Sequence, residues 1–478
     1  MAATCTLHLL HTNDIHSQFA NMPRIATCLR QLRQEWEGRN ERVLTLDAGD
    51  HLDRMNIISE ASFGLVNVQV MNRSGYQYVT IGNNEGVTLP KEKLDQLYEQ
   101  AAFTVIAGNL REGSDGRQPE WSVPSVIHHF PDLKVGLLGV TIPYPEAYRS
   151  MGWEVDDPLP LLARQIAELR SQADVIVLLS HLGYQADCRL ASELEGLDVI
   201  LGGHTHHVLE QGTRIGNTLI AQTGRFGQYV GHVRLEWNRE SRRIERIEAE
   251  LLAAEHYQPD ESLVSFLREE EQKAIRRLSL PIASLPRDLP ARWQQESPFG
   301  SFLAASIRAK TGAEVGLANG GLLLCGLKQG SLSYADLLNC VPHPINLCAV
   351  TLTGEQLLEL LEQAIQPEIV GKRLYGYGFR GKVEGWMGVD GMRIAYVNEK
   401  RPRIAKVEIN GMPLVSDREY RIGTVDMFLY NGLFPTLLKG KDPQLFLPVL
   451  LREILAETIQ DERMFQQAFT QRWFPLPG

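Results

Sequence analysis

The first half of the chain repeats one order of segments: a short apolar run, a few polar residues, then a stretch whose apolar side chains have helical spacing. Short apolar runs bounded by polar, turn-forming residues are typical of buried strands. Two of the intervening stretches, Ile25–Glu37 and Leu161–Gln172, have the spacing of helices that pack one face against a sheet. The order therefore predicts an α/β fold in which helices cover strands. The predicted strands are Thr6–His11, Val43–Leu46, Tyr78–Ile81, Val135–Val140, Val175–Ser180 and Val199–Leu201.

The chain is long enough for more than one domain. Its 478 residues would make about two or three domains of ordinary size. Asp260–Leu278 alternates acidic and basic residues, which predicts a solvated helix between domains. Pro281–Pro290 predicts a connector, and a second α/β region follows it. We therefore predict domains at residues 1–255 and 286–478, joined by a linker helix within residues 256–285.

The formal net charge of the chain is -10. An acidic surface disfavours a nucleic-acid backbone or an anionic membrane as the main partner. It is compatible with a small phosphate substrate, because bound metal ions dominate the field in their own site. No stretch approaches the roughly 18 apolar residues of a membrane helix. We therefore expect neither a nucleic-acid nor a membrane partner, and the sequence leaves the oligomeric state open.

The six cysteines are scattered along the chain without a C-x-x-C pair. This spacing argues against a structural zinc site or a redox dithiol. A chain of this length needs no disulfide to fold, so we expect free thiols, which suit a reducing compartment. The N-terminus lacks the basic start and the sustained apolar run of a secretory signal. These observations predict a cytoplasmic protein.

Five short polar motifs each come directly after a predicted strand. In α/β sheets, polar groups just past the strand ends gather in a crevice where ligands bind. A single histidine or Gly-Asp turn at such a position is more often structural, but the joint occurrence in this order indicates one site. The motifs are Asp14-Ile15-His16, Gly49-Asp50-His51-Leu52-Asp53, Gly82-Asn83-Asn84-Glu85, Ser180-His181 and Gly203-His204-Thr205-His206.

The residue types in these motifs suit a pair of divalent metal ions. Two such ions about 3.5–4 Å apart can clamp the attacking and leaving oxygens of phosphoryl transfer. A shared aspartate would offset the repulsion between the ions, and imidazoles and an amide oxygen would complete the coordination. Asp14 and His16 are two residues apart, as are His204 and His206, so each pair would point to one side of an extended segment.

The motifs resemble those of the calcineurin-like metallophosphoesterases, D-x-H, G-D-x-x-D, G-N-H-[DE], H and G-H-x-H. The Thr12-Asn13-Asp14 opening, the length and the second half resemble the two-domain 5′-nucleotidase family, which includes 2′,3′-cyclic-nucleotide phosphodiesterases and UDP-sugar hydrolases. This resemblance implies an N-terminal four-layer αββα sandwich and a C-terminal α/β substrate-binding domain. It also implies a hydrolase of nucleotides or sugar nucleotides that uses water activated by two metal ions.

The resemblance assigns roles to seven metal ligands. Nitrogen and oxygen ligands without sulfur suit Mn, Fe, Co or Zn, and the spacing does not choose among them. One ion would be held by Asp14, His16 and His206, the other by Asn83, His181 and His204, with Asp50 between the two.

The chain departs from the family pattern at Asn84, where the family has the histidine that stabilises the transition state and helps the leaving oxygen. The aspartate that normally supports this histidine is replaced by Val87. An asparagine can donate a hydrogen bond to a phosphoryl oxygen but cannot deliver a proton. General acid help is worth about 10²–10⁴-fold, so we expect a bias toward cyclic diesters, anhydrides and activated esters over plain 5′-monophosphates. His51 and His207, beside metal ligands, are weaker candidates to replace the missing histidine.

In the C-terminal half, the resemblance implies four substrate-binding residues. Asn319 belongs to an Asn-Gly-Gly turn that lacks the family's following arginine, and Arg373 is the candidate to supply that cation. Phe379 and Phe428 are the candidates to stack on a nucleotide base, worth about 1–3 kcal/mol per base. The alternatives are a solvated basic residue at Arg373 and core packing for both phenylalanines.

The sequence thus predicts a metal-dependent phosphoesterase of 5′-nucleotidase type. The main alternative is a catalytically weak protein that binds metal or nucleotide, which the Asn84 and Val87 replacements make plausible. A phosphodiesterase acting on nucleic acid fits the acidic charge poorly.

Overall fold

The computed structural model describes residues 4–476 of the chain. Contacts divide the chain into two compact units, residues 1–274 and 275–478. The division falls within α9 (Glu261–Leu278), close to the helix predicted at Asp260–Leu278. The domain limits predicted from the sequence stay a prediction, and each unit is described separately below.

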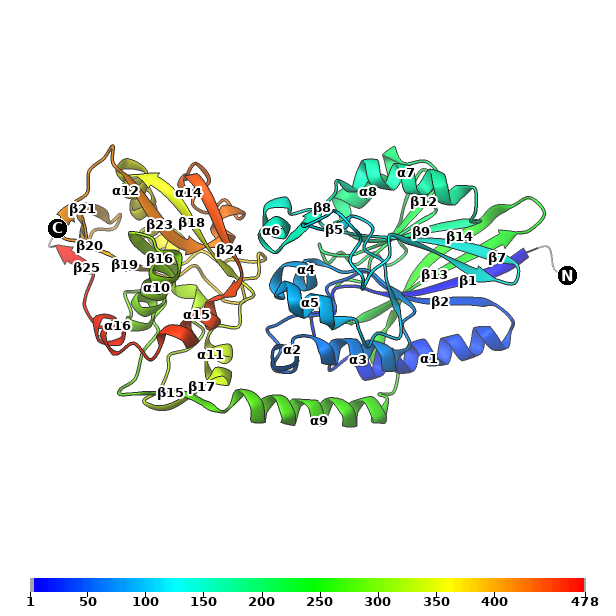
Figure 1. The fold of residues 1–478 in the computed structure, drawn as a ribbon, viewed down its shortest axis with the longest axis horizontal. Helices are drawn as coiled ribbons and strands as arrows, with labels where there is room; N and C mark the ends of the chain where they lie inside the picture. Colours follow the sequence, from blue (N-terminus) through cyan, green and yellow to red (C-terminus); the bar gives the residue numbers. More distant parts are fainter. Residues whose placement is uncertain (1–3, 477–478) are drawn as a thin grey trace. The chain divides into compact units, whose positions relative to one another are not determined.

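The first unit contains two six-stranded sheets, ordered β14-β13-β1-β2-β3-β4 and β11-β12-β10-β9-β7-β6, together with the two-stranded β5-β8 sheet (Figure 1). The first sheet consists of β1 (Thr4–Thr12), β2 (Arg42–Asp47), β3 (Tyr78–Val79), β4 (Thr104–Val105), β13 (Tyr229–Asn238) and β14 (Arg243–Ala253). The second consists of β6 (Ser125–Phe130), β7 (Leu133–Thr141), β9 (Val175–His181), β10 (Val199–Gly202), β11 (Thr213–Ile215) and β12 (Thr218–Ala221). The small sheet pairs β5 (Leu110–Glu112) with β8 (Trp153–Val155).

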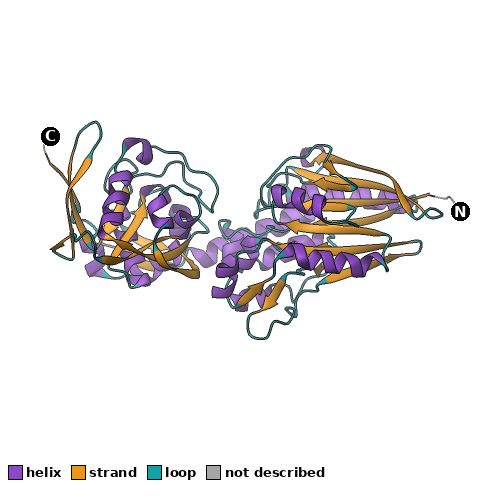
Figure 2. Cartoon of the chain, turned by 90° about the horizontal axis from the view of Figure 1, so that it is seen from above, coloured by secondary structure: helices purple, strands orange, loops and turns teal. Residues whose placement is uncertain are grey.

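The two large sheets pack face to face. Leu7 and Leu9 of β1 join Val177 and Leu179 of β9 in one buried apolar cluster. Their outer faces are covered by helices, visible as purple ribbons flanking the strands of this unit in Figure 2. These layers confirm the predicted αββα sandwich.

The covering helices follow from the amphipathic stretches of the sequence. Helix α7 (Pro158–Arg170) places Leu162 and Ile166 in a second buried cluster with residues of β7, β9 and β10. Burial of this apolar face, rather than helix propensity, supplies most of the stability of such a helix. The other helices of the unit are α1 (Met22–Gly38), α2 (Ile57–Ser62), α3 (Leu65–Ser74), α4 (Asn83–Thr88), α5 (Lys91–Leu97), α6 (Pro145–Ser150), α8 (Tyr184–Glu193) and η1 (Ala254–His256).

Parallel pairing brings the polar motifs to one edge of each sheet. Strands β1, β2 and β3 are mutually parallel neighbours, and β7, β9 and β10 are parallel in the second sheet. Because parallel strands end on the same side, the residues after β1, β2 and β3 come together, as do those after β9 and β10.

The second unit is built around a five-stranded sheet, β19-β16-β23-β18-β24, with a four-stranded sheet, β22-β21-β20-β25, and the β15-β17 pair. Its strands are β15 (Pro281–Leu285), β16 (Val315–Asn319), β17 (Gly330–Ser333), β18 (Asn346–Thr353), β19 (Met387–Asp390), β20 (Met392–Val397), β21 (Arg403–Ile409), β22 (Met412–Pro413), β23 (Glu419–Val425), β24 (Lys441–Leu450) and β25 (Trp473–Leu476). Its helices are α10 (Pro298–Thr311), η2 (Gly320–Leu322), α11 (Tyr334–Cys340), α12 (Gly354–Ala364), α13 (Pro367–Val370), η3 (Asp426–Leu429), α14 (Pro435–Leu438), α15 (Leu451–Thr458) and α16 (Glu462–Gln467).

Helix α10 forms the centre of the second unit's core. Ser297 caps the helix by accepting a hydrogen bond from the backbone N–H of Gly300 at 3.2 Å, and Pro298 occupies its first turn. Phe299 and Phe302 are fully buried in a single cluster with residues of the sheet. Part of the segment predicted as a connector, Pro281–Leu285, is instead strand β15, which pairs antiparallel with β17.

Cys325 and Cys340 form a disulfide with their Cα atoms 5.0 Å apart. The expectation of free thiols throughout was therefore wrong for this pair. Sequence spacing hid the pair, because the fold of residues 319–340 brings together two cysteines that are 15 residues apart. Cys5, Cys28, Cys188 and Cys348 remain free thiols.

Within residues 4–476, none of the helices combines the length and the apolar composition needed to cross a bilayer.

Candidate metal centre

The seven predicted metal ligands lie at or just after strand ends of the two large sheets. Asp14 and His16 follow β1, Asp50 follows β2, and Asn83 is the first residue of α4, which follows β3. His181 is the last residue of β9, and the remaining two ligands, His204 and His206, follow β10.

Five of these ligands have left-handed backbone conformations. The φ angles are 52° at Asp14, 48° at His16, 53° at Asp50, 71° at His204 and 58° at His206. The extended segments expected at both D-x-H and H-x-H were therefore wrong. The left-handed region costs a non-glycine residue about 1–3 kcal/mol and is concentrated at functional sites.

Hydrogen bonds between loops hold this backbone in place. The N–H of Asp14 donates to the carbonyl of Gly49, and the N–H of His16 donates to the carbonyl of Asp50, both at 2.9 Å. Gly49 itself has a φ of +90°, and a Cβ there would lie 2.8 Å from Nδ1 of His181. The close approach of the β2 and β9 loops thus requires glycine at this position.

One group of potential ligands comprises Asp14, His16 and His206. Oδ1 of Asp14 lies 3.6 Å from Nε2 of His16 and 3.4 Å from Nε2 of His206. The two Nε2 atoms are 3.1 Å apart. Three ligand atoms facing one another at these distances can hold one ion.

A second group comprises Asp14, Asp50 and His181. Nε2 of His181 is buried without a hydrogen-bond partner and lies 3.4 Å from Oδ2 of Asp50. Nδ1 of His181 is 2.7 Å from the carbonyl oxygen of Ala48. Because a carbonyl can only accept, Nδ1 carries a proton, so Nε2 is the nitrogen that would present a lone pair to a metal once the ring is neutral.

Asn83 and His204 adjoin the second group. Oδ1 of Asn83 lies 2.9 Å from Nδ1 of His204, whose ring centroid is 5.4 Å from that of His181. The backbone N–H of His204 donates to Oδ2 of Asp14 at 2.9 Å. The structure thus brings all seven predicted ligands together, and Asp14 and Asp50 both lie between the two histidine sets.

Charge in the centre is balanced by protons. Burial alone would lower the pKa of His181, but the carboxylates of Asp50 and Asp14 outweigh burial and raise that pKa to about 10. Burial would raise the pKa of Asp14, but contacts with His16 and His206 hold that pKa well below its usual range. Burial and the charge on His181 lower the pKa of His204 to about 4.

The donor set fits divalent ions. Two buried carboxylates face imidazole nitrogens that carry protons. A divalent cation can take the place of these protons, because an imidazole must be neutral to bind a metal ion. Carboxylate, imidazole and amide donors without sulfur belong to the range of Mn, Fe, Co and Zn.

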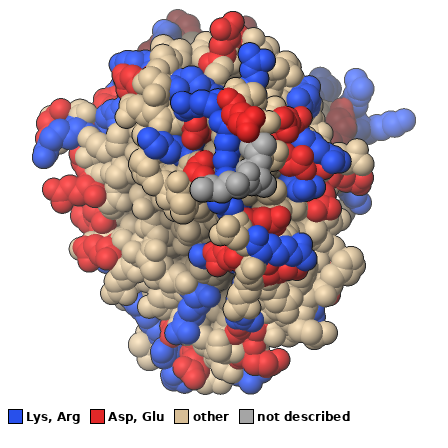
Figure 3. Space-filling model, turned by 90° about the vertical axis from the view of Figure 1, so that its right-hand side faces the viewer, with Lys and Arg blue, Asp and Glu red and all other residues tan. Residues whose placement is uncertain are grey.

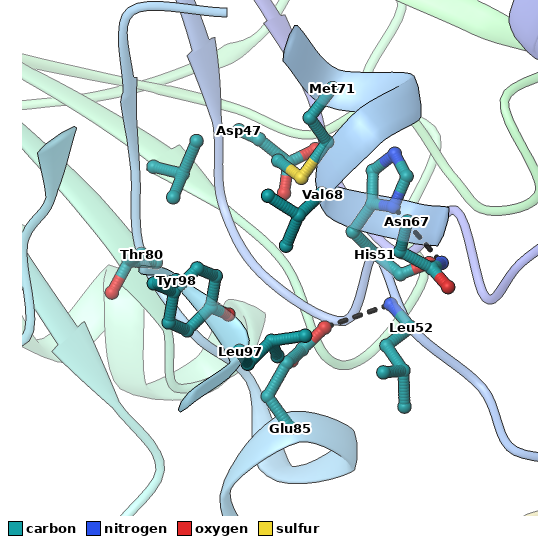
Figure 4. Close-up of a pocket in the computed structure, with 11 residues that line it drawn as sticks. Asp47, His51, Leu52, Asn67, Val68, Met71, Thr80, Glu85, Leu97 and Tyr98 are labelled. Carbon is teal, nitrogen blue, oxygen red and sulfur yellow. Dashed lines mark hydrogen bonds between the residues drawn. The ribbon is translucent and has the colours of Figure 1, made fainter. Parts of the chain in front are cut away.

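Glu85 holds the loops of the centre together. Its carboxylate accepts hydrogen bonds from the backbone N–H groups of Leu52 at 2.8 Å, Gly82 at 2.9 Å and Asp50 at 3.2 Å. Figure 4 shows Glu85 with its bond to Leu52, beside a small cavity that is also lined by Asp47 and His51. Burial and the charge of Asp50 raise the pKa of Glu85 to about 7.

Asn84 is engaged inside the protein. Its Nδ2 lies 3.0 Å from the carbonyl oxygen of Leu52 and 2.9 Å from Nδ1 of His16, and the residue is buried. Its backbone N–H donates to Oδ1 of Asp50 at 2.8 Å. The catalytic role predicted for Asn84 stays a prediction.

The two weaker candidates beside the ligands contact residues outside both ligand groups. His51 is buried, with Nδ1 3.3 Å from Nδ2 of Asn67. The ring of His207 packs against Tyr184 with centroids 4.7 Å apart.

Asp187 predicts a pH dependence of stability in the first unit. It is fully buried and accepts hydrogen bonds from Ser180 at 2.5 Å and Gln222 at 3.0 Å, yet burial raises its pKa from 3.8 to about 7. A carboxyl whose pKa is raised on folding contributes stability below its unfolded pKa and loses it as the pH rises through the folded value.

We therefore expect the unfolding free energy of the wild type relative to that of Asp187→Asn to fall between pH 4.5 and pH 8. At about 1.4 kcal/mol per pH unit, the fall should be about 3 kcal/mol. Urea unfolding of both full-length proteins in chelator measures it. A difference that does not change with pH would contradict the burial of a protonated carboxyl.

The four predicted substrate-binding residues lie in the second unit. Asn319 ends β16 and is fully buried, with Nδ2 donating to Oε2 of Glu384 at 3.1 Å. Arg373 is exposed. The ring of Phe379 lies in the core, stacked on His343, and Phe428 is fully buried and packs edge-on to Phe434. A base could stack on either phenylalanine only after the ring became exposed, so these roles stay predictions.

Three exposed or half-exposed tyrosines were not predicted from the sequence as candidate site residues. Tyr375 and Tyr377 are 76% and 56% exposed, in the glycine-rich segment that also contains Phe379. That segment was singled out, but no pattern ranked its tyrosines above its phenylalanine. Tyr144 reaches the metal centre from the loop before α6, with its hydroxyl 3.4 Å from Nε2 of His204. No motif marks it among the 14 tyrosines of the chain.

Comparison with known protein families gives two matches along the chain. Residues 7–208 match the calcineurin-like phosphoesterase model, and residues 278–436 match the 5′-nucleotidase C-terminal domain. Together with the sandwich and the clustered aspartates and histidines, these matches define a two-domain metal-dependent phosphoesterase.

Among similar proteins is the Bacillus subtilis (strain 168) protein named "Uncharacterized metallophosphoesterase YunD", which is 38% identical over 94% of this chain and 98% of its own length. The chain belongs to the metallophosphoesterase family, with a calcineurin-like phosphoesterase domain followed by a 5′-nucleotidase C-terminal domain. This confirms the resemblance and the classification as a metal-dependent phosphoric ester hydrolase.

Solved structures agree on the fold. A putative 5′-nucleotidase from Staphylococcus aureus has a TM-score of 0.70 at 19% identity, with 99% of this chain and 100% of that chain covered. The NAD nucleotidase NadN of Haemophilus influenzae has a TM-score of 0.69 at 16% identity, with 99% and 100% covered. At such identities the likeness concerns the fold alone.

Proposed function

We propose that the protein hydrolyses small nucleotide-like phosphate esters with the help of two divalent metal ions. The observation that carries this proposal is the convergence of two carboxylate–imidazole groups that share Asp14, from strand ends far apart in the sequence. The relatives support the substrate class: a 24% identical protein of Bacillus subtilis is named a trifunctional nucleotide phosphoesterase, although this chain matches only 31% of it.

The residues of the centre have distinct tasks. Asp14, His16 and His206 would hold one ion, Asn83, His181 and His204 the other, and Asp50 would lie between them. Bound ions supply Lewis acidity and lower the pKa of water. Ala48 fixes the tautomer of His181, and Glu85 holds three loop N–H groups, so the protein keeps its ligands positioned before the ions arrive.

The partner we propose is a small molecule. On the face shown in Figure 3, cationic and acidic side chains are interspersed, and the net charge is -10, which together favour a small phosphate over a nucleic-acid backbone. The prediction of a cytoplasmic location loses part of its support, because Cys325 and Cys340 are paired.

We expect the substrate preference to follow the leaving group. The position that the family gives to an imidazole holds Asn84, whose amide contacts Leu52 and His16 and cannot protonate a poor leaving oxygen. A panel of AMP, a 2′,3′-cyclic nucleotide, a UDP-sugar and an aryl phosphate, assayed with Mn²⁺, Co²⁺ or Zn²⁺ and with metal analysis, tests both points. The aryl and cyclic substrates should be turned over faster than AMP. Fastest turnover of AMP would refute the leaving-group argument.

The same assay separates the enzyme from a metal-binding protein without catalysis. That second function is favoured by the replacement of the family's catalytic pair by Asn84 and Val87. Stoichiometric metal binding without turnover of any substrate on the panel would establish it and end the proposal of a hydrolase.

A further inference from the structure

Tyr144 is an aromatic residue from outside the five motifs whose hydroxyl approaches the candidate metal centre. It lies in the loop between β7 and α6, and 37% of the residue is exposed. Its hydroxyl oxygen is 3.4 Å from Nε2 of His204, and the two ring centroids are 6.4 Å apart. The hydroxyl of a partly exposed residue thus lies beside a candidate ligand.

The two nitrogens of His204 have different neighbours. Nδ1 faces Oδ1 of Asn83, another candidate ligand, so Nδ1 is the nitrogen directed at the proposed ion. When Nδ1 uses its lone pair for a metal, the proton of the neutral ring is on Nε2. In the contact with Tyr144, Nε2–H is then the donor and the phenol oxygen the acceptor. This contact orients His204 without using the hydroxyl proton.

The centre lacks another neutral donor at the family's usual position. Asn84 occupies that position, and its amide nitrogen donates to the carbonyl oxygen of Leu52 at 3.0 Å and lies 2.9 Å from Nδ1 of His16. Charge that develops on a phosphoryl oxygen needs a fixed donor beside the metals, and a missing donor of this kind costs about 10²–10³-fold in turnover.

We propose that the Tyr144 hydroxyl donates a hydrogen bond to a phosphoryl oxygen of the substrate, in place of the donor that Asn84 does not supply. This inference rests on the proposed phosphoesterase function. A tyrosine hydroxyl can accept one hydrogen bond and donate another at the same time. It can therefore accept from the Nε2–H of His204 and donate its own hydrogen to the phosphate. No proton is transferred in this role, so all phosphate esters should depend on it alike.

The test compares Tyr144→Phe with Tyr184→Phe as a matched control. Tyr184 also lies against a histidine ring, that of His207, but its hydroxyl bonds Thr213 at 3.1 Å. Turnover of AMP and of an aryl phosphate at saturating metal is measured with bound metal content. The affinity of the metal-loaded proteins for inorganic phosphate is measured by calorimetry.

For Tyr144→Phe, we expect unchanged metal content, turnover lower by about 10²-fold on both substrates and phosphate binding weaker by about 10-fold. Tyr184→Phe should match the wild type. Unchanged phosphate affinity in Tyr144→Phe, or lower turnover explained entirely by lost metal, overturns the inference. Wild-type protein that turns over nothing refutes the proposed function, whereas the phosphate measurement still decides the role of Tyr144.

Discussion

Replacing Asp50 by asparagine is expected to remove both metal ions and to lower the turnover of an aryl phosphate by about 10³-fold or more. Oδ2 of Asp50 lies 3.4 Å from Nε2 of His181 and 3.8 Å from Nε2 of His16, between the two histidine sets. An amide in its place would provide one neutral donor where two cations need a shared negative charge. The measurements are metal content after dialysis and turnover with added Mn²⁺.

A parallel Asp14→Asn variant distinguishes the two carboxylates. Asp14 belongs to both groups of ligands, with Oδ1 3.4 Å from Nε2 of His206 and 4.0 Å from Nε2 of His181. If Asp50 is the shared ligand, Asp14→Asn should lose one ion and keep the one at His181. Loss of both ions in Asp14→Asn and of one ion in Asp50→Asn would mean that Asp14, and not Asp50, is the shared ligand.

Asp187→Asn is the control for these variants. Asp187 is also a fully buried aspartate near His181, but it bonds Ser180 and Gln222 and belongs to neither ligand group. It should keep both ions and its turnover. An Asp50→Asn protein with normal metal content and turnover would remove the basis for the whole centre.

The position of the site could be predicted from the sequence because parallel strands impose it. The apolar runs Thr6–His11, Val43–Leu46 and Val175–Ser180 are continuous enough to identify as buried strands, and residues beyond the ends of parallel neighbours must meet. The same runs predicted only that helices cover strands, and the four αββα layers came from the family resemblance.

The local geometry could not be predicted, because non-glycine residues rarely adopt positive φ. Asp14, His16 and His206 converge through left-handed turns stabilised by contacts with other loops, such as the bond from the Asp14 N–H to Gly49. A D-x-H motif looks extended in sequence because alternation by two is the simplest way to align two side chains. Tertiary hydrogen bonds override that preference here.

Which aromatic side chains of the second unit are buried could not be predicted from the sequence either. Phe379 and Phe428 match a family pattern, yet the structure places both in the core, where Phe379 stacks on His343. Tyr375, four residues earlier, is 76% exposed. Composition favours phenylalanine and tyrosine equally for stacking on a base, so only the fold shows which ring has an accessible face.

Restoring the missing catalytic pair should change the substrate preference more than any other substitution on the substrate side. We expect Asn84→His combined with Val87→Asp to raise AMP turnover by about 10²-fold and to raise aryl phosphate turnover far less, because only the poor leaving group needs a proton. Val87 lies one helical turn after Asn84 on α4 and is half-buried, so a carboxylate there can reach an imidazole at position 84.

The single variants show whether the two residues act as a unit. Val87→Asp alone should not raise AMP turnover, and Asn84→His alone should gain less than the pair, because an unsupported imidazole is not held in the productive orientation. Metal content must be followed in each, since Asn84 contacts Nδ1 of His16. An equal rise on AMP and on the aryl phosphate would show that the change acts on metal binding and not on the leaving group.

Combining these changes with Tyr144→Phe tests whether the two donor positions share one task. If Tyr144 compensates for the absent histidine, its removal should cost less in the Asn84→His, Val87→Asp background than in the wild type, and the two sets of effects should not add. Full additivity would mean that Tyr144 and position 84 act on different oxygens. In that case the wild type would lack a proton donor for the leaving oxygen whatever Tyr144 contributes. The slow turnover expected for AMP would then result from Asn84 alone.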